Sequence, residues 1–203
     1  MKHKKYKLSK DINKVTVKEK IINDNLSNRL HIKQEPIYIV IHETELGLIK
    51  YPKEYNMDYY QNLIISDGEK GNTIGYHYLC SDKEIWHFIP DDEMAHHVGS
   101  SLNKCSIGIE RIVCEGISFC DALHNQAKLA ATLMVKWNIP IENVISHKTG
   151  RILGGSLPKE CPNRLIAGQY GGFKLFYQEI RKCLQNQDFF YEILDSKAKK
   201  YTL

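Results

Sequence analysis

Apolar residues along the chain fall into short runs separated by polar turns. The run at residues 36–44, PIYIVIHET, is β-branched and almost continuously apolar, which predicts a strand buried on both faces. The runs IGYHYLC and EIWHFIP are separated by SDK and predict a hairpin. CSIGIERIV, from Cys105, and NVISH, from Asn143, predict two further strands.

Three other segments have helical spacing. They are MDYYQNLIIS at residues 57–66, the segment 121–138, and the segment after Gly172. In the last two, apolar side chains recur at steps of three or four: Leu123, Ala127, Ala130, Met134 and Trp137, then Phe173, Phe176, Ile180 and Leu184. Strands and helices alternate, which predicts an α/β fold with a central mixed sheet flanked by helices.

The pattern divides the chain into three parts. Residues 1–30 are rich in Lys, Asn and Asp and predict an irregular or partly helical arm. Residues 31–171 form the main domain, and residues 172–203 a C-terminal helical segment expected to dock on it. The last part, 187–203, repeats the apolar pattern more weakly. It could pair with the preceding helix, form a homodimer contact, or hold an anionic polymer through Lys197, Lys199 and Lys200.

Composition and charge limit the function classes. The chain has 203 residues, 42% of them hydrophobic and 26% charged, which is typical of one globular domain. A net charge of +4 suits an anionic surface such as a cell wall but is too weak to argue for nucleic acid. No apolar run approaches the ~20 residues of a membrane span. The basic N-terminus lacks the apolar stretch of a signal peptide, so we expect synthesis in the cytoplasm.

The six cysteines include no CxxC pair, which argues against a four-cysteine zinc site. Without a secretion signal, reduced thiols are favoured over disulfides. Four of the six lie in or beside apolar runs, whereas Cys161 lies in the polar loop SLPKECPNRL.

Two histidines could join Cys161 in a metal site. His42 ends the strand at 36–44, His147 ends the later strand, and Cys161 follows fourteen residues on. Two imidazoles and one thiolate would give three zinc ligands and leave a fourth position for water. The alternative is that each histidine is only a polar strand-end residue. HETEL lacks the HExxH spacing, which excludes a zincin.

Six motifs in order, YIVIHET, GYHY, AHHVG, SIGIE, SHKTG and PKECP, resemble the type 2 N-acetylmuramoyl-L-alanine amidases. That family includes phage lysozyme-type amidases, bacterial autolysins and peptidoglycan recognition proteins. The match covers about residues 36–165. It implies a peptidoglycan recognition protein-like fold with a groove at the strand ends. It also implies that residues 31–171 are a zinc amidase catalytic domain, with one Zn²⁺ per chain on His42, His147 and Cys161.

The resemblance also suggests roles for residues around the metal. Glu110 matches a proton acceptor, although an ion pair with Arg111 or with a nearby lysine is the structural alternative. Lys159 matches a lysine that could stabilise an oxyanion. Tyr76 matches a tyrosine that could donate a hydrogen bond to the scissile carbonyl, with packing as the alternative. His97 matches a histidine that lines the substrate groove.

One feature departs from the family pattern. The step from His147 to Cys161 is longer than usual, and Gly150, Gly154 and Gly155 within it predict an enlarged, flexible loop.

The implied reaction is hydrolysis of the amide bond between N-acetylmuramic acid and L-alanine in peptidoglycan. An enzyme of this kind without a signal peptide would reach the wall after lysis or through a pore, as endolysins do. Two alternatives stay open: a cytosolic recycling amidase acting on anhydromuramyl peptides, and a non-catalytic peptidoglycan-binding module. The presence of all three ligands and Glu110 favours catalysis.

Overall fold

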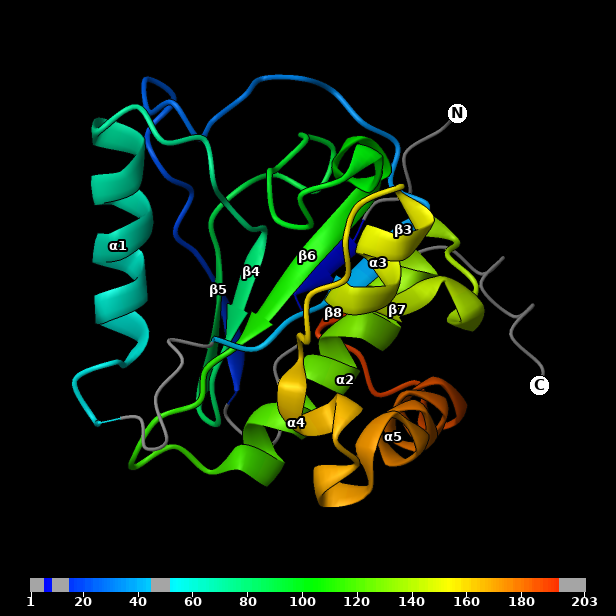
Figure 1. Cartoon of the computed structure of the whole chain (residues 1–203). Helices are drawn as coiled ribbons and strands as arrows, with labels where there is room; N and C mark the ends of the chain where they lie inside the picture. The colour runs from blue at the N-terminus through cyan, green and yellow to red at the C-terminus, as the bar shows by residue number, and fades with distance from the viewer. Residues whose placement is uncertain (1–5, 9–14, 45–51, 194–203) are drawn as a thin grey trace.

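The computed structural model describes residues 6–8, 15–44 and 52–193, and its centre is a six-stranded mixed sheet (Figure 1). The strand order is β2-β5-β4-β6-β3-β7. β4 and β5 form the predicted antiparallel hairpin, whereas the other neighbours are parallel. The strands are β2 Thr16–Glu19, β3 Tyr38–Ile41, β4 Tyr78–Cys80, β5 Glu84–His87, β6 Ser106–Arg111 and β7 Val144–Ser146.

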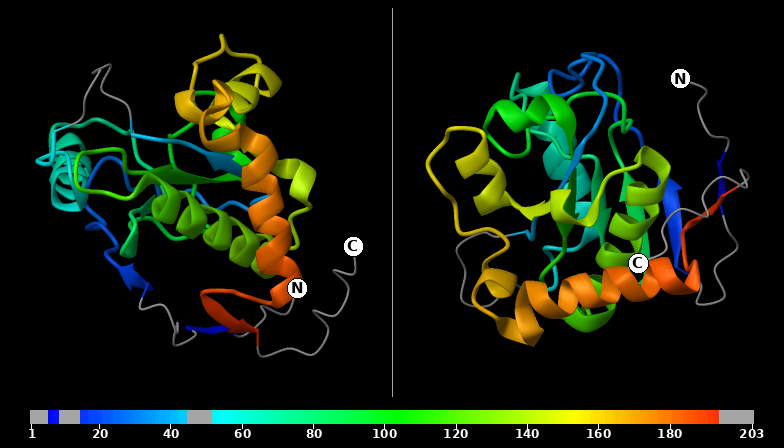
Figure 2. Two further views of the ribbon diagram at one scale, coloured as in Figure 1. Left: turned by 90° about the horizontal axis from the view of Figure 1, so that it is seen from below. Right: turned by 90° about the vertical axis from the view of Figure 1, so that its right-hand side faces the viewer.

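Helices cover both faces of the sheet, which confirms the predicted architecture. α5 packs across α2 on one face, and α1 stands at the β4–β5 end of the sheet (Figures 1 and 2). The helices are α1 Met57–Glu69, α2 Phe119–Trp137, α3 His147–Leu153, α4 Asn163–Ile166 and α5 Gly172–Asn186, with short 3₁₀ turns at η1 Ser101–Cys105, η2 Ile141–Asn143 and η3 Gln169–Gly171. α1 runs past the end predicted for it at residue 66.

The alternation of side chains along β3 decides what faces the functional side of the sheet. Ile39 and Ile41 are fully buried in the large core that includes α2 and α5. Val40 points the other way and packs with Val98. Because successive residues of a strand point to opposite faces, His42 falls on the side of Val40. The strand therefore delivers its last histidine to the face away from α2.

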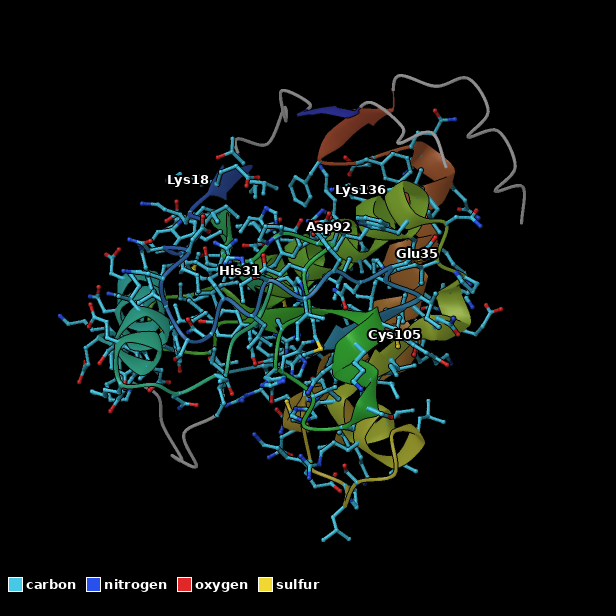
Figure 3. The ribbon with its side chains drawn as sticks, turned by 90° about the horizontal axis from the view of Figure 1, so that it is seen from above. Lys18, His31, Glu35, Asp92, Cys105 and Lys136 are labelled. Atoms are coloured by element: carbon cyan, nitrogen blue, oxygen red, sulfur yellow. The ribbon has the colours of Figure 1, made fainter. Side chains whose placement is uncertain are left out.

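Part of the N-terminal segment, Thr16–Glu19, belongs to the sheet. β2 pairs in parallel with β5, and Val17 is buried. Lys18 lies on this edge strand at the margin of the molecule (Figure 3). Further along, Arg29 forms a buried ion pair with Glu93, with Nε to Oε1 at 3.0 Å. The expectation of an irregular or partly helical arm was therefore wrong for Thr16–Glu19, because an edge strand tolerates lysines on its solvent side, whereas residues 20–30 form neither helix nor strand.

The C-terminal helix docks as predicted. Phe176, Ile180 and Leu184 of α5 are buried in the core with α2, and Phe173 packs at its border. Beyond α5 the chain differs from the expectation of a second helical stripe. Phe190 is buried and leads into strand β8, Tyr191–Ile193, which pairs with β1, Tyr6–Leu8. The basic residues Lys197, Lys199 and Lys200 lie outside the described residues, and the domain boundaries and the dimer contact stay predictions.

None of the helices in the described part of the chain is long and apolar enough to cross a membrane. All six cysteines are free thiols. Cys105, at the junction of η1 and β6 (Figure 3), is half-buried, whereas Cys161 is buried.

Candidate metal centre

The structure brings His42, His147 and Cys161 together at one edge of the sheet. β3 and β7 are parallel neighbours, and Ile41 pairs with Ser146, so the residues that follow them emerge side by side. The two imidazole centroids are 4.5 Å apart. One donor atom from each of the three residues lies within 4.8 Å of the others. His42 Nδ1 is 4.0 Å from Cys161 Sγ. The three donors are close enough to bind one ion between them.

The donor set fits a zinc ion. Neither ring nitrogen of His147 forms a hydrogen bond of normal geometry, although the side chain is buried. A buried polar atom without a partner is costly, and a metal would provide one. Cys161 is only 2% exposed, and burial raises the pKa of its thiol. A nearby cation offsets that effect and favours the thiolate. Two nitrogens and one sulfur are donors that zinc prefers.

Both histidines are neutral and so have a nitrogen lone pair to donate. Burial, followed by the charges of Lys159 and Arg151, lowers the pKa of His147 to about 4. Burial also lowers the pKa of His42 well below its usual value, and the neighbouring His147 acts in the same direction. Neutral imidazole is the form that binds metals.

A cavity of about 570 Å³ opens beside this centre. Six of the seven residues singled out from the sequence line it: Tyr76, His97, Glu110, His147, Lys159 and Cys161. His42 lies behind the wall and is 1% exposed. The cavity therefore leads to one side of the three donors, which leaves a coordination position within reach of a bound molecule.

Glu110 is the carboxylate nearest to the three donors. It follows Ile109 on β6 and points to the same face as His42, with Oε1 3.7 Å from His42 Nδ1. Its Oε2 has no hydrogen-bond partner. Burial raises the pKa of Glu110 to about 8, although Lys159 opposes the shift. The ion pair with Arg111 that was the structural alternative does not form, because the Arg111 guanidinium is bound by Glu43.

Lys159 and Tyr76 also border the cavity. Lys159 is exposed, and its charge lowers the pKa values of His42 and Glu110. Tyr76 packs edge-on against Phe88, with ring centroids 5.7 Å apart, and its hydroxyl donates to the Tyr60 carbonyl at 3.4 Å. In this structure the Tyr76 hydroxyl has a backbone partner, so its packing is observed and its role with substrate stays a prediction.

The long step between His147 and Cys161 is more ordered than its glycines suggested. Its first half is the helix α3. A methyl group at Gly150 would lie 2.8 Å from Val98 Cγ2, and one at Gly154 would lie 2.4 Å from Ser100 Cβ. Both glycines therefore allow close packing, and only Gly155, at φ +76°, uses the left-handed conformation. The predicted enlarged loop is therefore helical in its first half, and its flexibility stays a prediction.

Glu43 is a site residue that the sequence reading missed. It is 2% exposed and accepts hydrogen bonds from Arg111 Nη2 at 2.6 Å and from the Arg164 backbone N–H at 2.9 Å. Arg111 also donates to Gln126 Oε1 at 2.9 Å. Glu43 thus joins the strand that carries His42 to the segment just after Cys161. The signal was an arginine inside the apolar run CSIGIERIV, since a buried arginine requires an anionic partner.

The fold and the open centre define a protein that can hold a metal ion at the end of a groove. A model of the N-acetylmuramoyl-L-alanine amidase family matches residues 33–164, and the chain belongs to this family. The resemblance to this family that the sequence motifs indicated is thereby confirmed.

Relatives and solved structures agree with the family assignment. The chain is 30% identical over 157 residues to the amidase XlyA of Bacillus subtilis strain 168, covering 75% of this chain and 48% of XlyA. It is 29% identical over 158 residues to the amidase CwlH of the same strain, covering 75% and 57%. The chain thus spans about half the length of these relatives. The solved catalytic domain of XlyA has a TM-score of 0.68 at 26% identity, covering 81% of this chain and 99% of that chain. A mutant endolysin from Bacillus subtilis gives 0.68 at 27%, covering 82% and 99%.

Proposed function

We propose that the protein hydrolyses the amide bond between N-acetylmuramic acid and L-alanine in peptidoglycan, with one Zn²⁺ per chain. The observation that carries the proposal is the convergence of His42, His147 and Cys161 beside Glu110 at the end of a cavity. A binding module needs a groove, but it does not need a carboxylate with one buried oxygen left without a hydrogen bond beside three metal donors. The family membership supplies the substrate class.

His42, His147 and Cys161 would hold the zinc, and a bound zinc ion makes water acidic and polarises the scissile carbonyl. Glu110 would accept the proton of the attacking water and return it to the amine of L-alanine as the C–N bond breaks. Lys159, at the same cavity, would stabilise the negative oxygen of the tetrahedral intermediate. Tyr76 could donate to that oxygen after giving up its bond to Tyr60, and His97 lies in the wall that substrate would meet.

The remaining features of the proposal follow from the sequence. Residues 31–171 would be the catalytic domain, flanked by the segments 1–30 and 172–203. The enzyme would act on the cell wall, in the manner of endolysins or autolysins. Peptidoglycan is the proposed partner, and a homodimer through the C-terminal segment is a further expectation. Soluble anhydromuramyl peptides are the substrate that a recycling amidase would prefer.

Mass spectrometry of digested peptidoglycan tests the proposal. Intact sacculi and soluble muropeptides are treated side by side with the wild type and with the variants Glu110→Gln and Glu142→Gln. Glu142 is exposed and outside the cavity, so it is a matched control. We expect new L-alanine amino ends from sacculi with the wild type and Glu142→Gln only. New reducing sugar ends, cleavage within the peptide, or unchanged activity in excess chelator would contradict the proposal.

A further inference from the structure

His97 lies between a metal donor and the fold behind it. Its Nδ1 is 3.0 Å from His42 Nε2, and its Nε2 is 3.1 Å from Ser106 Oγ. Ser106 Oγ is in turn 2.6 Å from the Leu102 carbonyl. These contacts form a chain of polar atoms, which we call the His97 relay: His42, His97, Ser106 and Leu102. It starts on the side of the His42 ring opposite Cys161, because His42 Nδ1 faces the thiol.

The last contact of the relay fixes the direction of the others. A carbonyl oxygen only accepts hydrogen bonds, so the Ser106 hydroxyl must use its single hydrogen on Leu102. Toward His97 the hydroxyl can therefore only accept, and His97 Nε2 must carry the proton. In the neutral ring Nδ1 of His97 then has a lone pair and accepts from His42 Nε2–H. This leaves His42 with a lone pair on Nδ1, the nitrogen that faces Cys161.

The reverse direction would block the site. If His97 Nδ1 donated to His42, the neutral His42 ring would carry its proton on Nδ1 and could not bind a metal there. The Ser106 hydroxyl would also have to turn away from Leu102 to donate to His97 Nε2. The buried carbonyl would then lose a bond of 2.6 Å, which carries a cost.

The surrounding fold holds His97 in this position. The Asn103 side-chain oxygen accepts from the backbone N–H groups of His97 and Val98, at 3.1 and 2.9 Å. A methyl group on Gly108 of β6 would lie 2.6 Å from His97 Cγ. The absence of a side chain at residue 108 thus makes room for the ring, and the loop bonds fix its backbone.

We propose that His97 is a positioning residue that selects the Nε2–H tautomer of His42 and so directs its Nδ1 to the metal. The inference rests on the proposed function only in requiring that zinc binds at this centre. It differs from the role of substrate contact implied by the family resemblance. Mutating a group that hydrogen-bonds to a metal-binding histidine typically weakens metal affinity by about 10–100-fold.

Zinc affinity tests the proposal without reference to turnover. Competition with a chelator is measured for the wild type, His97→Leu, His97→Asn and His96→Leu. His96 is a matched control because its Nδ1 contacts Thr73 Oγ1 at 3.0 Å and not His42. We expect His97→Leu to weaken zinc binding by about 10–100-fold and His96→Leu to leave it unchanged. His97→Asn should recover most of the loss, because its amide oxygen occupies the place of Nδ1 and accepts the same proton.

A second measurement needs no variant. Nitrogen NMR of the zinc-loaded wild type, labelled on histidine, should show His42 with a proton on Nε2 and the metal on Nδ1. Coordination through His42 Nε2, or zinc affinities equal across all four proteins, would overturn the inference while leaving the proposed function intact. A raised KM in His97→Leu at unchanged zinc affinity would identify a substrate contact instead. A wild type that binds no zinc would overturn both.

Discussion

Two polar clusters lie back to back at the ends of β3 and β6, and they differ in how they are satisfied. Glu110 lines the cavity and His42 lies just behind its wall, whereas the carboxylate of Glu43 and the guanidinium of Arg111 meet on the opposite face of the sheet. Backbone pairing continues through this region, with His42 N–H donating to the Ile109 carbonyl and Thr44 N–H to the Arg111 carbonyl. Because successive side chains of an extended strand point to opposite faces, adjacent residues contribute to the two different clusters.

The buried cluster is better paired than the cavity cluster, and of the polar side-chain atoms of Glu43 and Arg111 only Arg111 Nε lacks a hydrogen bond. The carboxylate of Glu43 has partners in Arg111 and Arg164, and Arg111 is fully buried. In the cavity, both nitrogens of His147 and Oε2 of Glu110 lack hydrogen bonds. Native proteins pair almost all their buried polar atoms, so unpaired ones gathered in one place indicate a site that binds a ligand. The comparison separates residues that hold the fold from residues that act on a ligand.

The largest expected effect is on catalysis. Glu110→Gln removes the proton acceptor without removing a metal donor, so activity should fall by about 10²–10⁴-fold at unchanged zinc content. Folding stability should stay equal or rise, since a carboxylate whose buried Oε2 has no hydrogen bond is replaced by a neutral amide. Sacculus hydrolysis and urea unfolding measure the two effects. An activity loss below about tenfold would mean that Glu110 is not the proton acceptor and has a structural role.

The converse experiment breaks the paired cluster. Glu43→Ala leaves the buried Arg111 guanidinium without its carboxylate, which should lower the free energy of unfolding by about 3–5 kcal/mol. The loss should appear in the metal-free protein, because it does not depend on a bound ion. Replacing both Glu43 and Arg111 by Met should recover much of the stability, since no charge is left unpaired. Equal stability of Glu43→Ala and the wild type by urea unfolding would contradict this view of the cluster.

The C-terminal segment provides a test of stability far from the cavity. Phe190 is 2% exposed, and its N–H donates to Thr132 Oγ1 at 3.1 Å. Asp188 forms an ion pair at 2.7 Å with Lys128, which is nearly fully buried. Phe190→Ala should cost about 3 kcal/mol or more, and truncation after Asn186 should lower the melting temperature further.

Wall binding at two salt concentrations and the mass in solution complete the truncation experiment. A loss confined to salt-sensitive wall binding would assign the segment to targeting. A change in mass would support the homodimer contact, and an unchanged melting temperature would contradict the packing argument.

The smallest expected effect concerns His77, a paired residue close to the unpaired cluster. Its Nδ1 accepts from Gly108 N–H at 3.0 Å, and its Nε2 donates to the Glu93 carbonyl at 2.9 Å. Burial lowers its pKa to about 4. Because this value is below that of the unfolded chain, about 6.5, protonation favours unfolding. The stability that His77 contributes is therefore complete above pH 6.5 and is lost as the pH falls toward 4.

Proton NMR and urea unfolding across this range test the assignment. The His77 resonance should not titrate between pH 8 and 5, and the pH dependence of stability should flatten in His77→Gln. A midpoint near the ordinary histidine value would mean that the pairing seen here does not hold the ring neutral.

Much of this arrangement could be predicted from the sequence. The apolar run around β3, the hairpin and the apolar stripe of α2 are local patterns, and they correctly predicted a mixed sheet flanked by helices. His42 and His147 were recognisable because each stands where a buried strand ends. The hydrogen bond between His42 and His97 could not be predicted, because the two residues meet only through the packing of a loop against β6.

Other features depended on contacts between distant segments. The Glu43–Arg111 pair requires knowing that β3 and β6 are neighbours in the sheet. β2 was missed because its alternation is mostly polar, with Val17 as its buried residue. β8 was missed because it forms only by pairing with β1. Cys161 lies in a loop as expected, but its burial in a polar sequence context could not be predicted.

Zinc stoichiometry tests the central claim most directly. The protein is stripped with chelator, reloaded, dialysed and assayed for bound metal, together with Cys161→Ser and the matched variant Cys120→Ser, whose thiol is exposed and outside the cavity. We expect one zinc per chain in the wild type and in Cys120→Ser. Cys161→Ser should have greatly reduced zinc content and activity, because it removes the only sulfur donor among the three residues that converge there. Zinc content and activity undiminished in Cys161→Ser would contradict the account.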